Sequence, residues 1–298
     1  MAGAAVVALV TACGSGTASV VVAPPSSSAP SSSPASTPSS SGATTTPTPE
    51  STVRGPGLMR GLKVGQCLDD DQVGGFQASD CTMGHTYEVA AIVPNAKQPS
   101  DLKERNRVRN TTCITQVEKY IGGQTEVTSR RSIAASVSSD PEADQRIVCL
   151  TFPMNAAGDS AGMTAKVAKD VLRDPKRLLR GRVCLDKRTF DKGQTGETVP
   201  TCEDPHRAEA IAKVPLGKPG DRYPGIKELE KRARPLCTTA MKSYLGGVTR
   251  KDIEGGFSTR TQAQWDLGYV TAICFVNTAE PVRGSLEGIG NKPLADYR

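Results

Sequence analysis

The alternation of apolar and polar residues predicts the same series of strands twice along the chain. Each series begins with a short strand around a Cys-Leu-Asp motif and continues, after a polar turn, with a strand that ends at a proline. A third strand, in which apolar residues surround a cysteine, closes each series. The three pairs are VGQCLDD (64–70) and GRVCLDK (181–187), YEVAAIVP (87–94) and AEAIAKVP (208–215), and RIVCLTF (146–152) and YVTAICFV (269–276).

A helix is predicted between the second and the closing strand of each series. The first runs from Asp101 to Tyr120 with Gly122 as its stop, although its apolar stripe is thin. The second is placed to end at Gly246, and Pro235 in its middle predicts a kink or a break into two pieces. Each series is therefore expected to fold as a small α+β unit. The predicted apolar face of the second helix consists of Ile226, Leu229, Ala233, Cys237, Ala240, Met241 and Tyr244.

The cysteines repeat in the same way. Eight of the nine follow the amino-terminal segment as two sets of four, and successive offsets between the sets are 117, 121, 124 and 125 residues. Loop insertions produce such a drift, and CITQVEKYIGG from the first set matches CTTAMKSYLGG from the second. The sequence therefore predicts a tandem duplication. The two sets are Cys67, Cys81, Cys113 and Cys149, and Cys184, Cys202, Cys237 and Cys274.

The amino terminus is typical of an exported lipoprotein. An apolar run from Ala4 to Val10 is followed by small residues, and the stretch from Val10 to Cys13 resembles the lipobox of bacterial lipoprotein signal peptides. No Lys or Arg precedes the run, which departs from the usual basic start, and the run is too short to span a bilayer. We expect residues 1–12 to be a signal peptide and Cys13 to carry the lipid.

A low-complexity tract follows the lipobox. Residues 23–52 are nearly all Ser, Thr, Pro and Ala, so they cannot bury enough apolar surface to offset their ordering entropy. Such a tract reaches roughly 30 Å as a coil and about 90 Å as polyproline II. Residues 13–55 are therefore predicted to be a disordered tether that holds the folded part at the extracytoplasmic face of the cell membrane.

Composition and compartment together predict disulfides. The chain of 298 residues is 37% hydrophobic and 4% aromatic, which is lean material for large cores, and small exported domains are often stapled by disulfides. A zinc site is disfavoured, since no C-x2-C motif occurs. Four cysteines allow three pairings per repeat. We favour first with second and third with fourth, because one bond then joins neighbouring strands and the other fixes the helix to the last strand.

The two histidines occupy one frame, Cys-x3-His-x2-Glu, which places His85 with Glu88 and His206 with Glu209. As acid/base pairs they would serve a cell-wall hydrolase, but residues three apart on a strand face opposite sides. We favour a structural role, in which each imidazole caps a turn or bonds a buried carbonyl beside its disulfide. A metal-binding module is the other alternative.

Other catalytic signals are weak. The one G-x-S-x-G match, GDSAG at 158–162, has no strand leading into it and no counterpart in the second repeat. Walker and dinucleotide-binding motifs are absent from the sequence, so no cofactor is expected. Trp265 is a candidate ligand-facing ring, although a single Trp nine residues before a half-cystine is more often packed in the core. The prediction is a protein without catalytic residues or metal ligands.

Charge is concentrated in the second part of the chain. Residues 161–298 carry 25 basic and 17 acidic side chains, and the run from 166 to 188 holds nine basic and three acidic ones. A positive face near a lipid anchor can meet anionic lipid or wall polymers, and a solvated helix is the alternative. Nucleic acid is excluded as a partner, because the compartment is wrong and the few aromatic residues are not interleaved with the basic run.

Several motifs together resemble the septum-formation domain family of actinobacterial envelope proteins. The similarity covers residues 179–277 well and 61–155 less well, because the first repeat lacks the Tyr-Pro-Gly and the Trp. It implies an extracytoplasmic, non-enzymatic module that is linked by name to cell division. The motifs are VGQCLDD, CEDPHRAEA, Tyr223-Pro224-Gly225, CTTAMKSYLGG, and W-x2-G-x5-C at Trp265, Gly268 and Cys274.

The sequence thus predicts two disulfide-stapled α+β repeats on a lipid-anchored tether. We expect a non-catalytic binding or scaffold module of the cell envelope, with an envelope protein or an anionic wall or lipid component as its partner. The predicted boundaries are 1–12 for the signal peptide, 13–55 for the tether, 56–156 for repeat 1, 157–178 for a basic linker or helix, 179–279 for repeat 2 and 280–298 for a tail.

Overall fold

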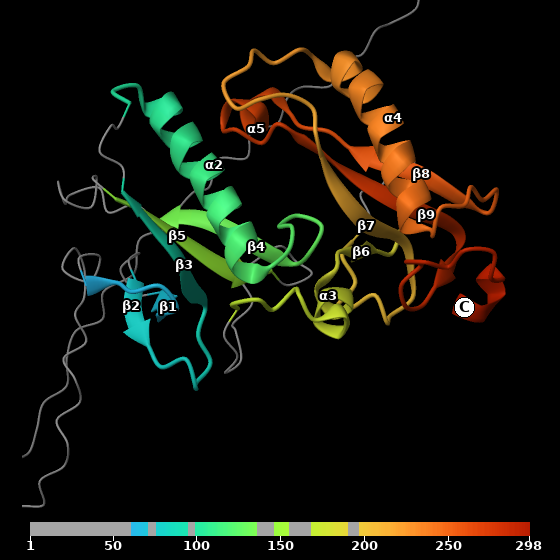
Figure 1. Ribbon diagram of the computed structural model, residues 1–298, viewed down its shortest axis with the longest axis horizontal. Coiled ribbons are helices and arrows are strands. Elements are labelled where there is room, and N and C mark those ends of the chain that lie inside the picture. Colours follow the sequence, from blue (N-terminus) through green and yellow to red (C-terminus); the bar gives the residue numbers. More distant parts are fainter. Residues whose placement is uncertain (1–60, 71–75, 95–98, 136–145, 155–167, 190–196) are drawn as a thin grey trace, which may run out of the picture. The chain divides into compact units, whose positions relative to one another are not determined.

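The computed structural model contains two antiparallel sheets, each with a long helix packed on it (Figure 1). It describes residues 61–70, 76–94, 99–135, 146–154, 168–189 and 197–298. The predicted α+β class is confirmed. The signal peptide, Cys13, the tether and the GDSAG motif lie outside the described residues. In the described ranges, no helix combines the length and apolar character needed to cross a membrane.

The first sheet has five strands in the order β2-β1-β3-β5-β4. All three predicted strands are present, and β2 and β4 are additional. β2 lies where a polar turn was expected, and it pairs with β1 from Cys67↔Ser79 to Asp70↔Phe76. The strands are β1 (Cys67–Asp70), β2 (Phe76–Ser79), β3 (Tyr87–Pro94), β4 (Arg130–Ala135) and β5 (Arg146–Pro153).

The second sheet has four strands in the order β6-β7-β9-β8. In the first sheet β1 pairs with β3, β3 with β5 and β5 with β4. In the second sheet β6 pairs with β7, β7 with β9 and β9 with β8 in the same way. The order β1-β3-β5-β4 therefore matches β6-β7-β9-β8, and the place of β2 is taken by a single β-bridge, Leu185↔Thr198, on the outer edge of β6. The strands are β6 (Cys184–Leu185), β7 (His206–Pro215), β8 (Ile253–Ser258) and β9 (Thr271–Val282).

Helix α2 (Leu102–Ile121) follows the predicted limits closely. The Asp101 side chain accepts a hydrogen bond of 2.7 Å from the backbone N–H of Glu104 and caps the first turn. Gly122 ends the helix in the left-handed region at φ 77°, where glycine carries no steric penalty. The helix packs on β3, β4 and β5, with Val117 among its buried residues.

Helix α4 (Ile226–Tyr244) packs on β7, β8 and β9. Pro235 was predicted to kink the helix or break it into two pieces, and the break is wrong, because one helix runs through the proline. Buried Ala233 and the disulfide-bonded Cys237 hold the turns on either side of Pro235 against the sheet, which offsets a cost of about 3 kcal/mol for an interior proline. Ile226, expected on the buried face, is instead 48% exposed, and the buried face begins at Leu229.

Segments outside the predicted repeats also enter the cores. We refer to residues 61–172 as the first half and to residues 173–298 as the second half. Ala168 and Leu172, from the predicted linker, are buried against Ile121 of α2. Leu286 and Ile289, from the predicted tail, are buried in a cluster around Leu245, just after α4. The short elements are α3 (Pro175–Gly181), α5 (Gln262–Asp266) and the 3₁₀ helix η2 (Leu294–Tyr297).

The two halves meet at the segment that follows α2. Val127 lies in one buried apolar cluster with Ala210 and Phe275 of the second sheet. The backbone N–H of Val183 donates to the carbonyl of Val127 at 3.0 Å, and Thr128 forms a β-bridge with Arg182. All described residues belong to one compact unit.

Candidate functional site

The eight cysteines form four disulfides, and the predicted pairings are confirmed. The bonds Cys113–Cys149 and Cys237–Cys274 each join a long helix to the last strand of its sheet. The other bond of each half joins β1 to the loop before β3, or β6 to the loop before β7, and not to a neighbouring strand. Each bond closes a loop of 14 to 37 residues, for which the unfolded-state model gives a stabilisation of about 3 to 4 kcal/mol. The remaining pairs are Cys67–Cys81 and Cys184–Cys202.

Both histidines are buried, His85 in the turn before β3 and His206 as the first residue of β7. Nδ1 of His85 lies 3.2 Å from the carbonyl oxygen of Met83, and Nδ1 of His206 lies 2.8 Å from that of Asp204. Because a carbonyl can only accept, Nδ1 carries the proton in each ring. Within the described residues, Nε2 of both rings has no hydrogen-bond partner. The histidines therefore close their turns, which is the structural role predicted from the sequence.

His85 and Glu88 converge in the first half, because they do not both lie on the strand for which opposite sides were predicted. Ligand atoms of Cys67, His85 and Glu88 all lie within 4.8 Å of one another. His85 precedes the start of β3 at Tyr87, so the alternation of strand side chains does not extend to it. The corresponding group in the second half contains its glutamate and both half-cystines of one disulfide but not its histidine.

Neither of these two groups of candidate ligands contains a free thiolate that could bind a metal. The sulfurs are bound in disulfides, so no thiolate is present, and a structural zinc site needs four ligands, usually Cys or His. In the first half only the imidazole of His85 and the carboxylate of Glu88 remain as donors. The described residues thus do not supply a complete zinc site.

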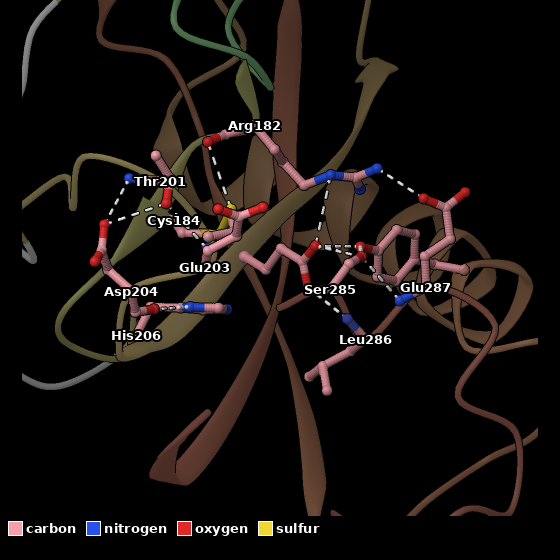
Figure 2. Close-up of a disulfide and its surroundings, with 12 residues drawn as sticks. Arg182, Cys184, Thr201, Glu203, Asp204, His206, Ser285, Leu286 and Glu287 are labelled. Carbon is pink, nitrogen blue, oxygen red and sulfur yellow. Dashed lines mark hydrogen bonds and ion pairs between the residues drawn. A yellow bond between two sulfur atoms is a disulfide. The ribbon is translucent and has the colours of Figure 1, made fainter. Parts of the chain in front are cut away.

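In the second half, the buried carboxylate of Glu209 gathers several donors. Figure 2 labels three of the residues that contact it, Arg182, Ser285 and Leu286. Its Oε1 accepts hydrogen bonds from the hydroxyl of Tyr244 and from Oγ of Ser285, the latter at 2.9 Å. Its Oε2 accepts from the backbone N–H of Leu286 at 3.1 Å, and Nε of Arg182 lies 3.5 Å from Oε1. A buried carboxylate is stable when it is satisfied in this way.

Arg182 connects this cluster to the surface. Its Nη2 donates to the exposed carboxylate of Glu287 at 2.8 Å, and its guanidinium lies 4.9 Å from the centre of the Tyr244 ring. Burial, together with the charge of Glu209, raises the pKa of the Tyr244 hydroxyl far above its ordinary value. Tyr244 therefore remains protonated and acts as a donor to Glu209 throughout the neutral range.

The first half builds a simpler version around Glu88. The carboxylate accepts from the Tyr120 hydroxyl and, at 2.5 Å, from the backbone N–H of Ala168. Burial and the adjacent Glu88 raise the pKa of Tyr120. Burial lowers the pKa of Arg130, an effect that the charge of Glu88 opposes. Each glutamate, which lies on β3 or on β7, thus forms hydrogen bonds both to the end of a long helix and to the segment that follows the sheet.

The partners of these glutamates are not predicted from the sequence. Tyr120 and Tyr244 stand in the matching stretches KYIGG and SYLGG, so their repetition was the available signal. Arg182 belongs to the predicted basic run, and Ser285 lies in the segment predicted to be a tail. No sequence pattern marks a backbone N–H such as that of Leu286 as a donor to a distant carboxylate.

Trp265 lies in the core on α5, as favoured from the sequence. Its side chain is 1% exposed, and Nε1 donates to the carbonyl of Asp221 at 2.7 Å. The ring meets Tyr223 edge-on, with centroids 6.0 Å apart, and a Cβ on Gly217 would lie only 2.8 Å from it. The tyrosine and the tryptophan that the first half lacks therefore form one packed unit, in which the Trp265 ring is enclosed in the core.

The basic run is partly neutralised by its own surroundings. Arg173 pairs with Asp170 at 2.7 Å and Arg180 approaches Glu203 at 3.7 Å, both on the surface. Arg182 is buried in the Glu209 cluster. Lys166 and the residue that follows it lie outside the described part of the chain, so the structure does not test the predicted positive face as a whole.

Comparison with known proteins identifies a family. A family model described as septum formation matches residues 64–274 as a single span that covers both halves. No curated protein matches the chain, and no solved structure matches it.

Proposed function

The chain belongs to the septum-formation family, and we propose that it is a non-catalytic binding or scaffold module of the cell envelope that acts during septum formation. The family description supports the link to cell division. The lipobox-like segment that ends at Cys13 and the Ser/Pro/Thr-rich tether support a lipid-anchored, extracytoplasmic location. The four disulfides agree with an oxidising compartment.

One observation carries the non-catalytic part of this proposal. The glutamate of each repeated frame is buried, and its carboxylate is occupied by hydrogen bonds from the chain itself. A general acid or base must instead reach a proton of the substrate. The histidines are equally buried, and their Nδ1 atoms close turns. The frame that suggested a hydrolase therefore serves the fold.

A metal-binding module is the second candidate. The proximity of Cys67, His85 and Glu88 within 4.8 Å and the unpartnered Nε2 of buried His85 favour it. The disulfide of Cys67 opposes it, since that sulfur cannot act as a thiolate. Metal analysis of the purified protein distinguishes the two candidates.

The test follows the protein in dividing cells. We expect a fluorescent fusion of the full chain to concentrate at division sites in the membrane fraction. Cys13→Ser should release the chain from the membrane, while Ser15→Ala, a nearby change that keeps the lipidated cysteine, should not. A fusion that spreads evenly over the cell contradicts the role in septation, and release of wall fragments by the purified protein contradicts the non-catalytic assignment.

A further inference from the structure

A cleft of about 410 Å³ opens beside the contact between the two halves. This volume falls within the usual range for small-ligand sites. Part of its wall comes from β4 and the segment before it, and part comes from β8, β9 and the α5 region. Residues that line it include Glu126, Arg131, Ser132, Arg260, Tyr269 and Phe275.

The cleft combines an apolar floor with a polar rim. Val183, Ile273 and Phe275 line it and are each less than 10% exposed. Ser132 and Gln264 contribute hydroxyl and amide groups near the solvent. A concave apolar surface with a few convergent polar groups is the usual form of a site for a small molecule.

Two acidic side chains near the cleft already have basic partners. Nη2 of Arg260 donates to Oε1 of Glu126 at 2.6 Å, and Nε of the same guanidinium donates to the carbonyl of Thr271 at 3.1 Å. The ammonium of Lys213 pairs with the carboxylate of Glu118 and lies 4.0 Å from Oε2 of Glu126. These four charges cancel.

Arg131 is the unbalanced charge. Its Nη1 donates to the carbonyls of Thr128 and Arg130, at 2.5 and 3.2 Å. Within the described ranges, no carboxylate forms an ion pair with it. Burial lowers the pKa of Arg131, and the negative charge of Glu126 opposes this effect. An arginine remains protonated in proteins nonetheless, so the cleft carries one surplus positive charge.

We propose that this cleft binds a small ligand that carries a single carboxylate next to an apolar group. The guanidinium of Arg131 pairs with the carboxylate, and the wall formed by Ile273 and Phe275 covers the apolar part. A planar guanidinium fork suits the two oxygens of a carboxylate. One surplus charge matches a monoanion, whereas a doubly charged phosphate would leave a negative charge in a partly buried site. This inference deepens the proposed binding function and rests on it.

The first experiment compares acids with their uncharged analogues. The full chain with Cys13→Ser, secreted from an oxidising compartment, is titrated with N-acetyl-leucine, N-acetyl-leucinamide and inorganic phosphate by NMR. We expect the acid to bind at least tenfold more tightly than the amide and more tightly than phosphate, and to weaken as salt is added. Equal affinity for acid and amide, or no binding of the acid at millimolar concentration, overturns the proposal.

Variants then locate the site. Arg131→Met should weaken binding of N-acetyl-leucine at least tenfold, and Arg131→Lys should retain part of the affinity. Ser132→Trp should abolish binding by filling the cleft while leaving every charge in place. The matched control is Arg177→Met, which removes an exposed arginine of α3 that does not line the cleft and should bind as the parent does.

Folding and cellular readouts separate the outcomes. If Arg131→Met does not fold, Ser132→Trp still decides the proposal, because its substitution is at a half-buried position on β4. Unchanged binding by a folded Ser132→Trp protein places the ligand elsewhere and overturns the proposal. A fusion that reaches the septum while its cleft fails to bind the acid refutes this inference alone. A fusion that never reaches the septum refutes the proposed function and leaves the binding result intact.

Discussion

The two halves use one frame but reinforce it differently. The buried Glu209 holds Tyr244, Ser285, the N–H of Leu286 and, more loosely, Arg182. In the first half, the glutamate accepts from a tyrosine hydroxyl and a backbone N–H, with a charged arginine nearby. The common part therefore fixes a helix end to a sheet, and the added partners determine how strongly each half depends on its glutamate.

The disulfide beside the frame is also more deeply buried in the second half than in the first. Both sulfurs of Cys184–Cys202 belong to residues that are fully buried, whereas Cys81 of the first-half bond is partly exposed. The second half also has the packed pair of Tyr223 and Trp265. The second half therefore has more buried contacts around its frame than the first half has.

The largest expected contrast follows removal of each glutamate. Glu209→Ala leaves buried Arg182 with only its partner Glu287 at the surface, so we expect a loss of about 3–5 kcal/mol of unfolding free energy. Glu88→Ala should cost about 1–3 kcal/mol, since it chiefly leaves hydrogen-bond donors unpaired. Denaturant titrations of both variants and the parent measure this difference, and equal losses would show that the extra partners contribute nothing.

Alkaline pH should weaken the second half more. The folded pKa of Tyr244 is raised above its ordinary value of 10, so its stabilising contribution is complete below pH 10 and is lost as the pH rises above it. The expected slope is about 1.4 kcal/mol per pH unit for Tyr244. Tyr120 should follow the same slope over a shorter range of pH, because that side chain is less buried and solvent screens it, so its pKa is raised less.

Unfolding between pH 9 and 11 tests this slope in the parent and in the variants Tyr244→Phe and Tyr120→Phe. Both substitutions should flatten the pH dependence, and the effect of Tyr244→Phe should extend to a higher pH than that of Tyr120→Phe. An equally steep profile in Tyr244→Phe contradicts the assignment.

Reduction should reach the first half sooner. A thiolate must contact a sulfur in order to exchange with it. Of the bonds Cys67–Cys81 and Cys184–Cys202, only the first has a partly exposed residue. We expect mild dithiothreitol followed by alkylation to label Cys81 several-fold faster than Cys202, as measured by peptide mass spectrometry. Faster labelling of Cys202 would mean that the second half opens more readily than its burial indicates.

The smallest effect is expected on the surface of α3. Arg180 lies 3.7 Å from Glu203, and both side chains are more than half exposed, so Arg180→Ala should change stability by less than about 0.5 kcal/mol. Thermal unfolding beside Glu209→Ala checks this, and a loss comparable to that of Glu209→Ala would show that surface pairs matter as much as buried ones.

The sequence predicted the parts whose signal is local or repeated. The predicted order of helix and last strand favoured the pairing of Cys113 with Cys149 and of its counterpart, and apolar runs predicted β3, β5, β7 and β9. β8 was not predicted, because its sequence, IEGGFS, has two glycines and little alternation of apolar and polar residues. β4 was not predicted, because it carries two arginines and leaves Ile133 exposed.

The rest depends on contacts between distant segments. Glu88 and Ala168 are 80 residues apart, and Glu209 and Leu286 are 77 apart. Periodicity describes one element at a time, so it assigned residues 157–178 to a linker and 280–298 to a tail. The cleft beside Arg131 depends on both halves, and neither repeat predicts it alone.

The most direct test of the central claim is an intact-mass measurement on the full chain with Cys13→Ser, purified from an oxidising compartment. The protein is denatured with and without a thiol-alkylating reagent, and zinc is assayed in the same sample. A structural role for the repeated Cys-x3-His-x2-Glu frame predicts eight missing hydrogens, no alkylation and no stoichiometric zinc. Free thiols together with bound zinc would contradict it and would make His85 and Glu88 metal ligands.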